Sequence, residues 1–140
     1  MNMMHKDVIP QVLAKRLHVK DATTRIAVVG ASNDPAKYGN VIVKNLSQKG
    51  YTVLPVNPKE AAIAGTEAYA DLGVVPRPVH VVDFVTPPVV TLQVLRQIDP
   101  ASVDAVWFQD GSFDDAVLAE AERFTVAVHG ACIMVATNWL

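Results

Sequence analysis

The sequence predicts an α/β fold: a single Rossmann-like, doubly wound parallel sheet with helices on both faces. The chain has 140 residues, which is about one domain. Short, almost wholly apolar runs alternate along it with segments of helical periodicity, as in βαβ units. The uninterrupted apolar character of these runs is typical of parallel strands covered on both faces. Small or turn-forming residues follow four of the runs and mark where the strands end.

The composition is that of a globular protein and gives no sign of nucleic-acid binding, disulfide bonds or a membrane span. Hydrophobic residues make up 51% of the chain and charged residues 19%, so a packed core can form. The net charge of −2 gives no global field to recruit nucleic acid or anionic lipid. The single cysteine, Cys132, excludes an intramolecular disulfide, and His5 and His18 have no partner at metal-ligand spacing. No apolar run approaches the roughly 18 residues of a membrane span, and no signal peptide is recognised, so we expect a cytoplasmic protein.

Residues 1–20 are predicted to be an N-terminal helical extension, followed by the Rossmann-like domain over 21–140. Asp7 is a predicted helix cap, and Pro10 is tolerated in the first turn. Apolar residues then recur at helical spacing and are expected to pack on the domain: Ile9, Val12, Leu13 and Leu17. We interpret this segment as a lid or edge helix.

The first half of the domain is predicted as strand 25–29, helix 40–49 and strand 51–56. Gly50 stands at the usual position after a helix end. Residues 65–69 favour a turn and a short edge strand, and residues 71–74 one helical turn. A further strand covers 79–85, where His80 and Asp83 are expected to point to opposite faces as separate polar contacts.

The second half begins with Thr86, a predicted N-cap with prolines in the first turn of its helix. Four apolar residues form the predicted buried stripe of that helix: Val90, Val94, Leu95 and Ile98. Strand 105–108 follows, with Trp107 expected in the core. A helix capped by Ser112 or Asp114 then runs to about residue 123, before strand 125–128 and a short tail.

The loop after the first strand is the leading candidate for a binding site. Gly30 permits a sharp turn, Ala31 keeps the backbone accessible and Ser32 adds a hydroxyl group. Strand, small-residue turn and helix form the phosphate-binding corner of doubly wound folds. The alternative interpretation is an ordinary turn between strand and helix that binds no ligand.

Three further strand ends are expected to meet this corner, because ligands bind outside the carboxyl ends of such sheets. These ends are residues 57–59, 86–88 and 109–111. In NAD-binding domains the second glycine of the loop motif stands where this chain has Ser32. An acidic residue ends their second strand, where this chain has Asn57, so the sequence disfavours NAD. Lys59 favours a ligand with an extra phosphate, as NADP and coenzyme A both have.

The motifs as a set resemble the small bacterial coenzyme A-binding proteins of the YccU type. The resemblance covers about residues 24–135. It rests on Val29-Gly30-Ala31-Ser32, Pro35-x-Lys37-x-Gly39, Gly50-Tyr51-x-Val53-x-Pro55-Val56-Asn57-Pro58, Val81-Val82-Asp83, Trp107-x-Gln109-x-Gly111 and Cys132-Ile133-Met134. The predicted strand 79–85, with Pro87 and Pro88 after it, also resembles the coenzyme A-binding domain of the succinyl-CoA synthetase α subunit.

The resemblance implies a Rossmann-like domain that binds coenzyme A, with no established reaction. The implied binding residues are Gly30, Ala31, Ser32, Lys37, Tyr38, Asn57, Pro58, Lys59, Thr86, Pro87 and Gln109. Gly30 to Ser32 would hold the pyrophosphate, the two lysines would meet phosphate charge, and Gln109 would lie near the pantetheine path. The chain departs from the family at Gly130 and Ala131, where many members have an Asp-Arg pair, and at Val85 and Thr86, where many have an arginine.

The favoured function is therefore binding of coenzyme A or acyl-CoA, as a carrier or sensor, with an unknown protein partner. One alternative is an NAD(P)-binding protein of redox type. Another is a small acyl-CoA-linked enzyme that uses Cys132, with His129 as a nearby base. We favour a structural Cys132, since a free cysteine is most often a small buried residue.

Overall fold

The computed structural model describes residues 9–140, so the predictions for His5 and Asp7 lie outside the described residues. The elements in chain order are α2 (Gln11–His18), β1 (Arg25–Val29), α3 (Tyr38–Gln48), β2 (Thr52–Val56), β3 (Ala62–Ile63), β4 (Thr66–Glu67), the 3₁₀ turn Leu72–Val74, β5 (Val81–Phe84), α4 (Pro88–Arg96), the 3₁₀ turn Pro100–Ser102, β6 (Ala105–Phe108), α5 (Asp115–Ala121), β7 (Ala127–His129) and α6 (Ile133–Trp139).

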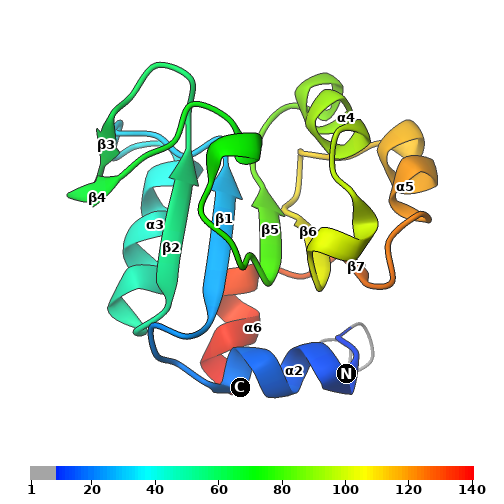
Figure 1. The fold of residues 1–140 in the computed structure, drawn as a ribbon, viewed down its shortest axis with the longest axis horizontal. Helices are drawn as coiled ribbons and strands as arrows, with labels where there is room; N and C mark the ends of the chain where they lie inside the picture. Colours follow the sequence, from blue (N-terminus) through cyan, green and yellow to red (C-terminus); the bar gives the residue numbers. More distant parts are fainter. Residues whose placement is uncertain (1–8) are drawn as a thin grey trace.

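The main sheet has five strands in the order β2-β1-β5-β6-β7, and every neighbouring pair is parallel (Figure 1). The chain winds from β1 outward to β2, returns past β1 to β5, and then continues in the other direction. This reversal is the defining feature of a doubly wound sheet and creates a switch point between β1 and β5. The predicted fold class is confirmed. The β3–β4 hairpin forms a separate antiparallel sheet, and within the predicted edge strand Tyr69 pairs with Val56 of β2 in a single parallel bridge.

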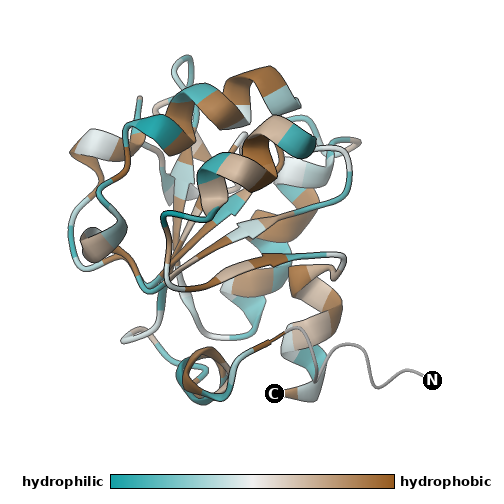
Figure 2. Cartoon of the chain, turned by 90° about the vertical axis from the view of Figure 1, so that its right-hand side faces the viewer, coloured by the Kyte–Doolittle hydropathy of each residue, from teal (hydrophilic) through white to brown (hydrophobic). Residues whose placement is uncertain are grey.

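Two apolar layers sandwich the sheet, because successive side chains of a strand face opposite sides. Helices α2, α3 and α6 cover the face that carries Ile26, Val28 and Trp107. Helices α4 and α5 cover the face that carries Ala27, Val29 and Phe108. Figure 2 shows the hydrophobic strands between these two groups of helices. Helices on both faces explain why the strands are apolar without alternation.

Helix α2 belongs to this core. The side chains of Leu13 and Leu17 are buried, and the hydroxyl group of Tyr51 donates a hydrogen bond to the carbonyl oxygen of Leu17. The prediction for Val12 was wrong, since this residue is 74% exposed. Helix α2 therefore closes the amino end of the sheet and is not a lid over a site.

The largest correction concerns the C-terminal residues, which were predicted to be a tail. They form helix α6, which buries Ile133 and Ala136 against the sheet. The Lys49 ammonium group donates to the Met134 carbonyl oxygen and to Thr137 Oγ1, both at 2.7 Å. These contacts fasten α6 to the end of α3, so a short helix is stable here through packing.

Helix starts also differ from the prediction. Helix α3 begins at Tyr38, two residues earlier than expected. Pro87, not Thr86, occupies the N-cap position of α4, and Thr86 Oγ1 instead lies 2.8 Å from Thr91 Oγ1. In the stripe of α4, Val90 is 36% exposed, whereas Thr91 is buried together with Leu95.

The cap of α5 was left open between two residues, and the structure settles it. Asp114 Oδ1 accepts a hydrogen bond from the backbone of Val117 at 3.0 Å, so Asp114 is the cap. Ser112 Oγ instead donates to the Gln109 carbonyl oxygen. Among the described residues, no helix is both long and apolar enough to cross a membrane.

Candidate functional site

A pocket of about 450 Å³ lies at the switch point of the sheet. Its walls come from the ends of β1 and β2, from the outer turns of α4 and from both 3₁₀ turns. Four of the residues that the sequence singled out line it: Gly30, Asn57, Pro58 and Thr86. We call it the switch-point pocket. It stands where doubly wound sheets bind their ligands.

Two glycines shape the corner beside this pocket. Gly30 has a φ of +97°, and a Cβ atom there would lie 2.9 Å from the side chains of Val85 and Thr86. A Cβ atom on Gly39 would lie only 2.2 Å from the Gly30 carbonyl oxygen. The first turn of α3 thus packs directly against the loop. A larger residue at Gly39 requires a backbone shift, and one at Gly30 is strained by the positive φ and displaces two side-chain methyl groups.

Two asparagine side chains hold the carbonyl groups of the corner. Asn57 Nδ2 donates to the Ala31 carbonyl oxygen at 2.8 Å, and Asn40 Nδ2 donates to the Ser32 carbonyl oxygen at 3.0 Å. Within residues 9–140, the backbone N–H groups of Ala31, Ser32 and Asn33 have no hydrogen-bond acceptor. The carbonyl oxygens are therefore engaged and three consecutive donors are available, which suits an anionic group.

The two lysines that the sequence analysis assigned to phosphate binding lie outside this pocket. Lys37 and Lys59 are exposed, and neither lysine lines the switch-point pocket. Arg77 is the cation that lines the switch-point pocket. The sequence analysis missed it, because it lies in an irregular segment between Pro76 and Pro78, where no periodicity directs attention to a residue.

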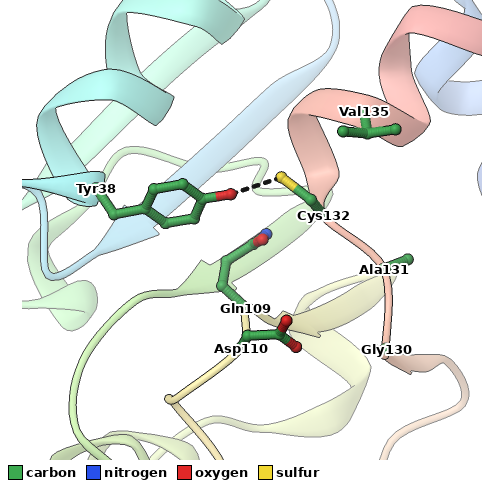
Figure 3. A pocket seen from close by; sticks show the side chains of 7 residues that line it. All are labelled: Tyr38, Gln109, Asp110, Gly130, Ala131, Cys132 and Val135. Atoms are coloured by element: carbon green, nitrogen blue, oxygen red, sulfur yellow. Dashed lines mark hydrogen bonds between the residues drawn. The ribbon is translucent and has the colours of Figure 1, made fainter.

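A second pocket, of about 440 Å³, opens between the first turns of α3 and α6 (Figure 3). Tyr38 and Gln109, both predicted site residues, line it together with Asp110, Cys132 and Val135. The Tyr38 hydroxyl oxygen lies 2.7 Å from Cys132 Sγ. We call it the Tyr38–Cys132 pocket.

Cys132 is not the fully buried residue that the sequence suggested. It occupies the N-cap position of α6 with an intermediate exposure and lines the pocket wall. The pairing with His129 that the alternative enzyme interpretation requires is absent from the described structure, where the His129 ring packs on Phe113 at 5.2 Å between centroids. The partner of the thiol is Tyr38, which no sequence pattern linked to it.

Asp83 and Gln109 form the polar floor on this face of the sheet. Gln109 Nε2 donates to Asp83 Oδ1 at 2.6 Å, while Asp83 Oδ2 is buried without a hydrogen-bond partner in the described chain. Burial raises the pKa of the Asp83 carboxyl group well above its usual value, and the Gln109 hydrogen bond offsets only part of this. His80 makes a separate contact, since its Nδ1 accepts from the Arg25 backbone.

The remaining predicted site residues lie around these two pockets without lining them. Ala31 and Ser32 belong to the corner loop, and Pro87 follows Thr86 at the start of α4. Ser32 Oγ accepts a hydrogen bond from the Asp34 backbone at 3.0 Å, so its hydroxyl group also orders the loop.

Comparison with known proteins decides the family. A family model described as a CoA binding domain matches residues 24–138. The chain belongs to this family of CoA-binding domains. The match spans the whole sheet and both pockets, and leaves α2 outside it.

Relatives of this CoA-binding domain include a subunit of a larger enzyme. The α subunit of the ADP-forming acetate–CoA ligase II from Pyrococcus furiosus is 38% identical over 82 residues. Those residues are 58% of this chain but only 18% of the ligase subunit, so the chain spans a small part of that relative. An uncharacterized protein from Bacillus subtilis, YneT, is 26% identical over 80% of this chain and 84% of its own length.

Solved structures of similar size share the fold of this CoA-binding domain. A conserved hypothetical protein from Pyrococcus furiosus is 43% identical, with a TM-score of 0.75 over 80% of this chain and 97% of its own. A hypothetical protein from Pyrococcus horikoshii is 28% identical, with a TM-score of 0.79 over 97% of this chain and 91% of its own.

Proposed function

We propose that this CoA-binding domain binds coenzyme A or an acyl-CoA, as a carrier or sensor and not as a catalyst. The observation that carries the proposal is the corner at Gly30. Three unpaired backbone donors, in Ala31, Ser32 and Asn33, stand beside a pocket at the switch point of the sheet. A pyrophosphate group matches such a row of donors.

The shape of the site supports a ligand with a long arm beyond its nucleotide. The switch-point pocket accommodates a nucleotide, and Arg77 there offers a partner for phosphate. The Tyr38–Cys132 pocket, at the other side of the corner, accommodates the arm. Gln109 is then in reach of the amide groups of pantetheine.

Lys59 is proposed to meet the ribose phosphate and Lys37 the pyrophosphate. Asn57 fixes the Lys59 backbone, because its Oδ1 accepts from the Lys59 N–H at 2.8 Å. Lys59 follows Asn57 and Pro58, which line the switch-point pocket at the end of β2. Lys37 precedes α3, whose first turn abuts the Gly30 corner.

The test is calorimetry of the purified protein with coenzyme A, NADP and NAD in turn. We expect coenzyme A to bind at least about tenfold more tightly than NAD, a difference of about 1.4 kcal/mol. Equal or reversed affinities contradict the proposal, and preferential binding of NADP supports the alternative of a redox-type protein. Mass spectrometry of small molecules released from the freshly purified protein identifies any acyl group.

A further inference from the structure

The Tyr38–Cys132 pocket differs in charge from the switch-point pocket. Among the described residues that line it, none is cationic, and Asp110 contributes a carboxylate. An anionic phosphate group is therefore disfavoured in it. A neutral arm that ends in a sulfur group matches this lining better.

A buried amide group points to a ligand in this pocket. Gln109 is only 1% exposed, and its Nε2 is occupied by Asp83. Its Oε1 has no hydrogen-bond donor in the part of the chain that the structure describes, although the residue lines the pocket. Figure 3 shows the amide end of Gln109 directed toward the Tyr38 hydroxyl group and Cys132 Sγ. Because this oxygen accepts no hydrogen bond within the described chain and the residue lines the pocket, a ligand N–H group fits there.

The two pockets flank one junction of the backbone. Gly39, next to Tyr38, abuts the Gly30 carbonyl oxygen at the edge of the switch-point pocket. The backbone N–H of Gln109 donates to the Phe84 carbonyl oxygen at 3.1 Å, two residues before Thr86. The Gly30–Gly39 contact therefore lies between the two pockets, with Gly30 lining one and Tyr38 lining the other.

Resting on the proposed function, we propose that the Tyr38–Cys132 pocket is a thiol-exchange site. In it, Cys132 forms a reversible mixed disulfide with the pantetheine sulfur of a coenzyme A disulfide. The nucleotide of the ligand directs the reaction by binding at the switch point, and Gln109 accepts a hydrogen bond from the arm.

The exchange needs no additional oxidant. The Cys132 thiol loses its proton, and its sulfur attacks one sulfur atom of the ligand disulfide. A new S–S bond forms between Cys132 and pantetheine while the old S–S bond breaks. The departing sulfur leaves as a thiolate and takes up a proton. The Cys132 thiol and coenzyme A disulfide are thus converted into the mixed disulfide and free coenzyme A.

Tyr38 is the positioning residue of this step. Desolvation, together with the nearby Cys132, raises the pKa of Tyr38 well above its usual value, so its hydroxyl group keeps its proton at neutral pH. It can therefore donate to the sulfur of Cys132 at 2.7 Å and hold that sulfur at the pocket wall. The Val135 and Ala131 side of the pocket supplies no competing donor side chain.

The experiment incubates the full-length protein with coenzyme A disulfide and follows the intact mass over time. Parallel incubations use glutathione disulfide at the same concentration and the variants Cys132→Ser and Tyr38→Phe. We expect one adduct of coenzyme A per chain, reversed by dithiothreitol and absent in Cys132→Ser. Coenzyme A disulfide should react at least about tenfold faster than glutathione disulfide. Tyr38→Phe should slow the reaction about three- to tenfold, because phenylalanine cannot make the hydrogen bond that positions the Cys132 sulfur.

Two results overturn the inference: no adduct with coenzyme A disulfide, or equal rates for the two disulfides. An unchanged rate in Tyr38→Phe removes the role of Tyr38. Calorimetry of the wild-type protein with reduced coenzyme A, in dithiothreitol, separates the two proposals. Binding without an adduct rejects exchange and leaves the proposed function standing, whereas loss of both rejects both.

Discussion

Gln109 Nε2 lies 2.6 Å from Asp83 Oδ1, and together the two side chains form an enclosed polar pair between β5 and β6. The second oxygen of Asp83 has no partner among the described residues. A carboxylate in such a place is poorly solvated, so the protonated form is favoured. The pair therefore makes the stability of the fold dependent on pH.

The first prediction is that Asp83→Asn alters this pH dependence. The pKa of Asp83 is raised in the folded state, so the folded protein binds the proton more tightly than the unfolded chain. The free energy of unfolding then falls as pH rises from about 4, the unfolded pKa, toward the folded pKa. Asparagine keeps the bond from Gln109 but cannot ionise. The variant should gain stability over the wild type at pH 8 and lose that advantage near pH 4.

Urea unfolding at several pH values measures this difference. Asp110→Asn is the matched control, because Asp110 is exposed at the same pocket and its substitution should change stability by less than about 0.5 kcal/mol. Parallel pH profiles for wild type and Asp83→Asn contradict the prediction.

The second prediction is that Gly39→Ala destabilises the protein. Alanine in a helix is normally favoured over glycine by about 0.5–1 kcal/mol. Here the added Cβ atom would lie 2.2 Å from the Gly30 carbonyl oxygen. Overpacking against backbone should outweigh the helical gain and cost about 1–3 kcal/mol in the free energy of unfolding. The displaced corner should also bind coenzyme A more weakly.

Ser47→Ala serves as the control for Gly39→Ala, because Ser47 is exposed on the same helix. Its effect on the free energy of unfolding should stay within about 0.5 kcal/mol. Denaturant unfolding and calorimetry of both variants give the comparison, and a stabilised Gly39→Ala would show that the corner is not closely packed.

The third prediction separates the lysines with coenzyme A and dephospho-coenzyme A, which lacks the ribose phosphate. Lys59→Ala should weaken binding of coenzyme A and leave dephospho-coenzyme A nearly unchanged. Lys37→Ala should weaken both by a similar factor. A charge-assisted contact contributes about 1.5–3 kcal/mol, so each affected affinity should fall about tenfold or more. Equal losses for both ligands in Lys59→Ala reject its assignment.

Arg77→Ala completes this set of affinities. Because Arg77 lines the switch-point pocket, its loss should weaken coenzyme A. If Arg77→Ala weakens binding of coenzyme A only, while Lys59→Ala weakens binding of both ligands equally, the ribose phosphate contacts Arg77 in the switch-point pocket and not Lys59.

The fourth prediction concerns the attachment of α2. Leu17 is fully buried in the core face that α2 shares with α3 and α6. Leu17→Ala should lower the free energy of unfolding by about 2–5 kcal/mol. Val12→Ala, on the exposed side of the same helix, should stay within about 0.5 kcal/mol. A small effect of Leu17→Ala in thermal or urea unfolding would show that α2 is only loosely attached.

The strands were the most predictable part of the fold. The ranges of β1 and β6 agree with the sequence prediction, because both are short apolar runs bounded by turn residues. Helix α6 was missed because it is short and buries few apolar residues, and much of its support comes from Lys49 on another helix. Local sequence carries no sign of such a tertiary contact.

The site was predictable only in its outline. Turn residues at the strand ends located the corner and the crevice, since topology brings those ends together. The contacts that define the pockets join residues distant in the chain: Tyr38 and Cys132 are 94 residues apart, and Asp83 and Gln109 are 26 apart. No periodic pattern encodes such a pair, and Arg77 lies in a segment without regular structure.

The polarity of the sheet has a consequence for how this domain can be combined with others. Figure 1 shows α2 and the end of α6 together beneath the sheet, away from the strand ends that carry the corner. Both ends of the described chain therefore lie on the side opposite to the carboxyl ends of the strands. A fused partner or a fluorescent reporter can be joined there without blocking the crevice, which makes the fold suited to reuse as a portable module in longer polypeptides.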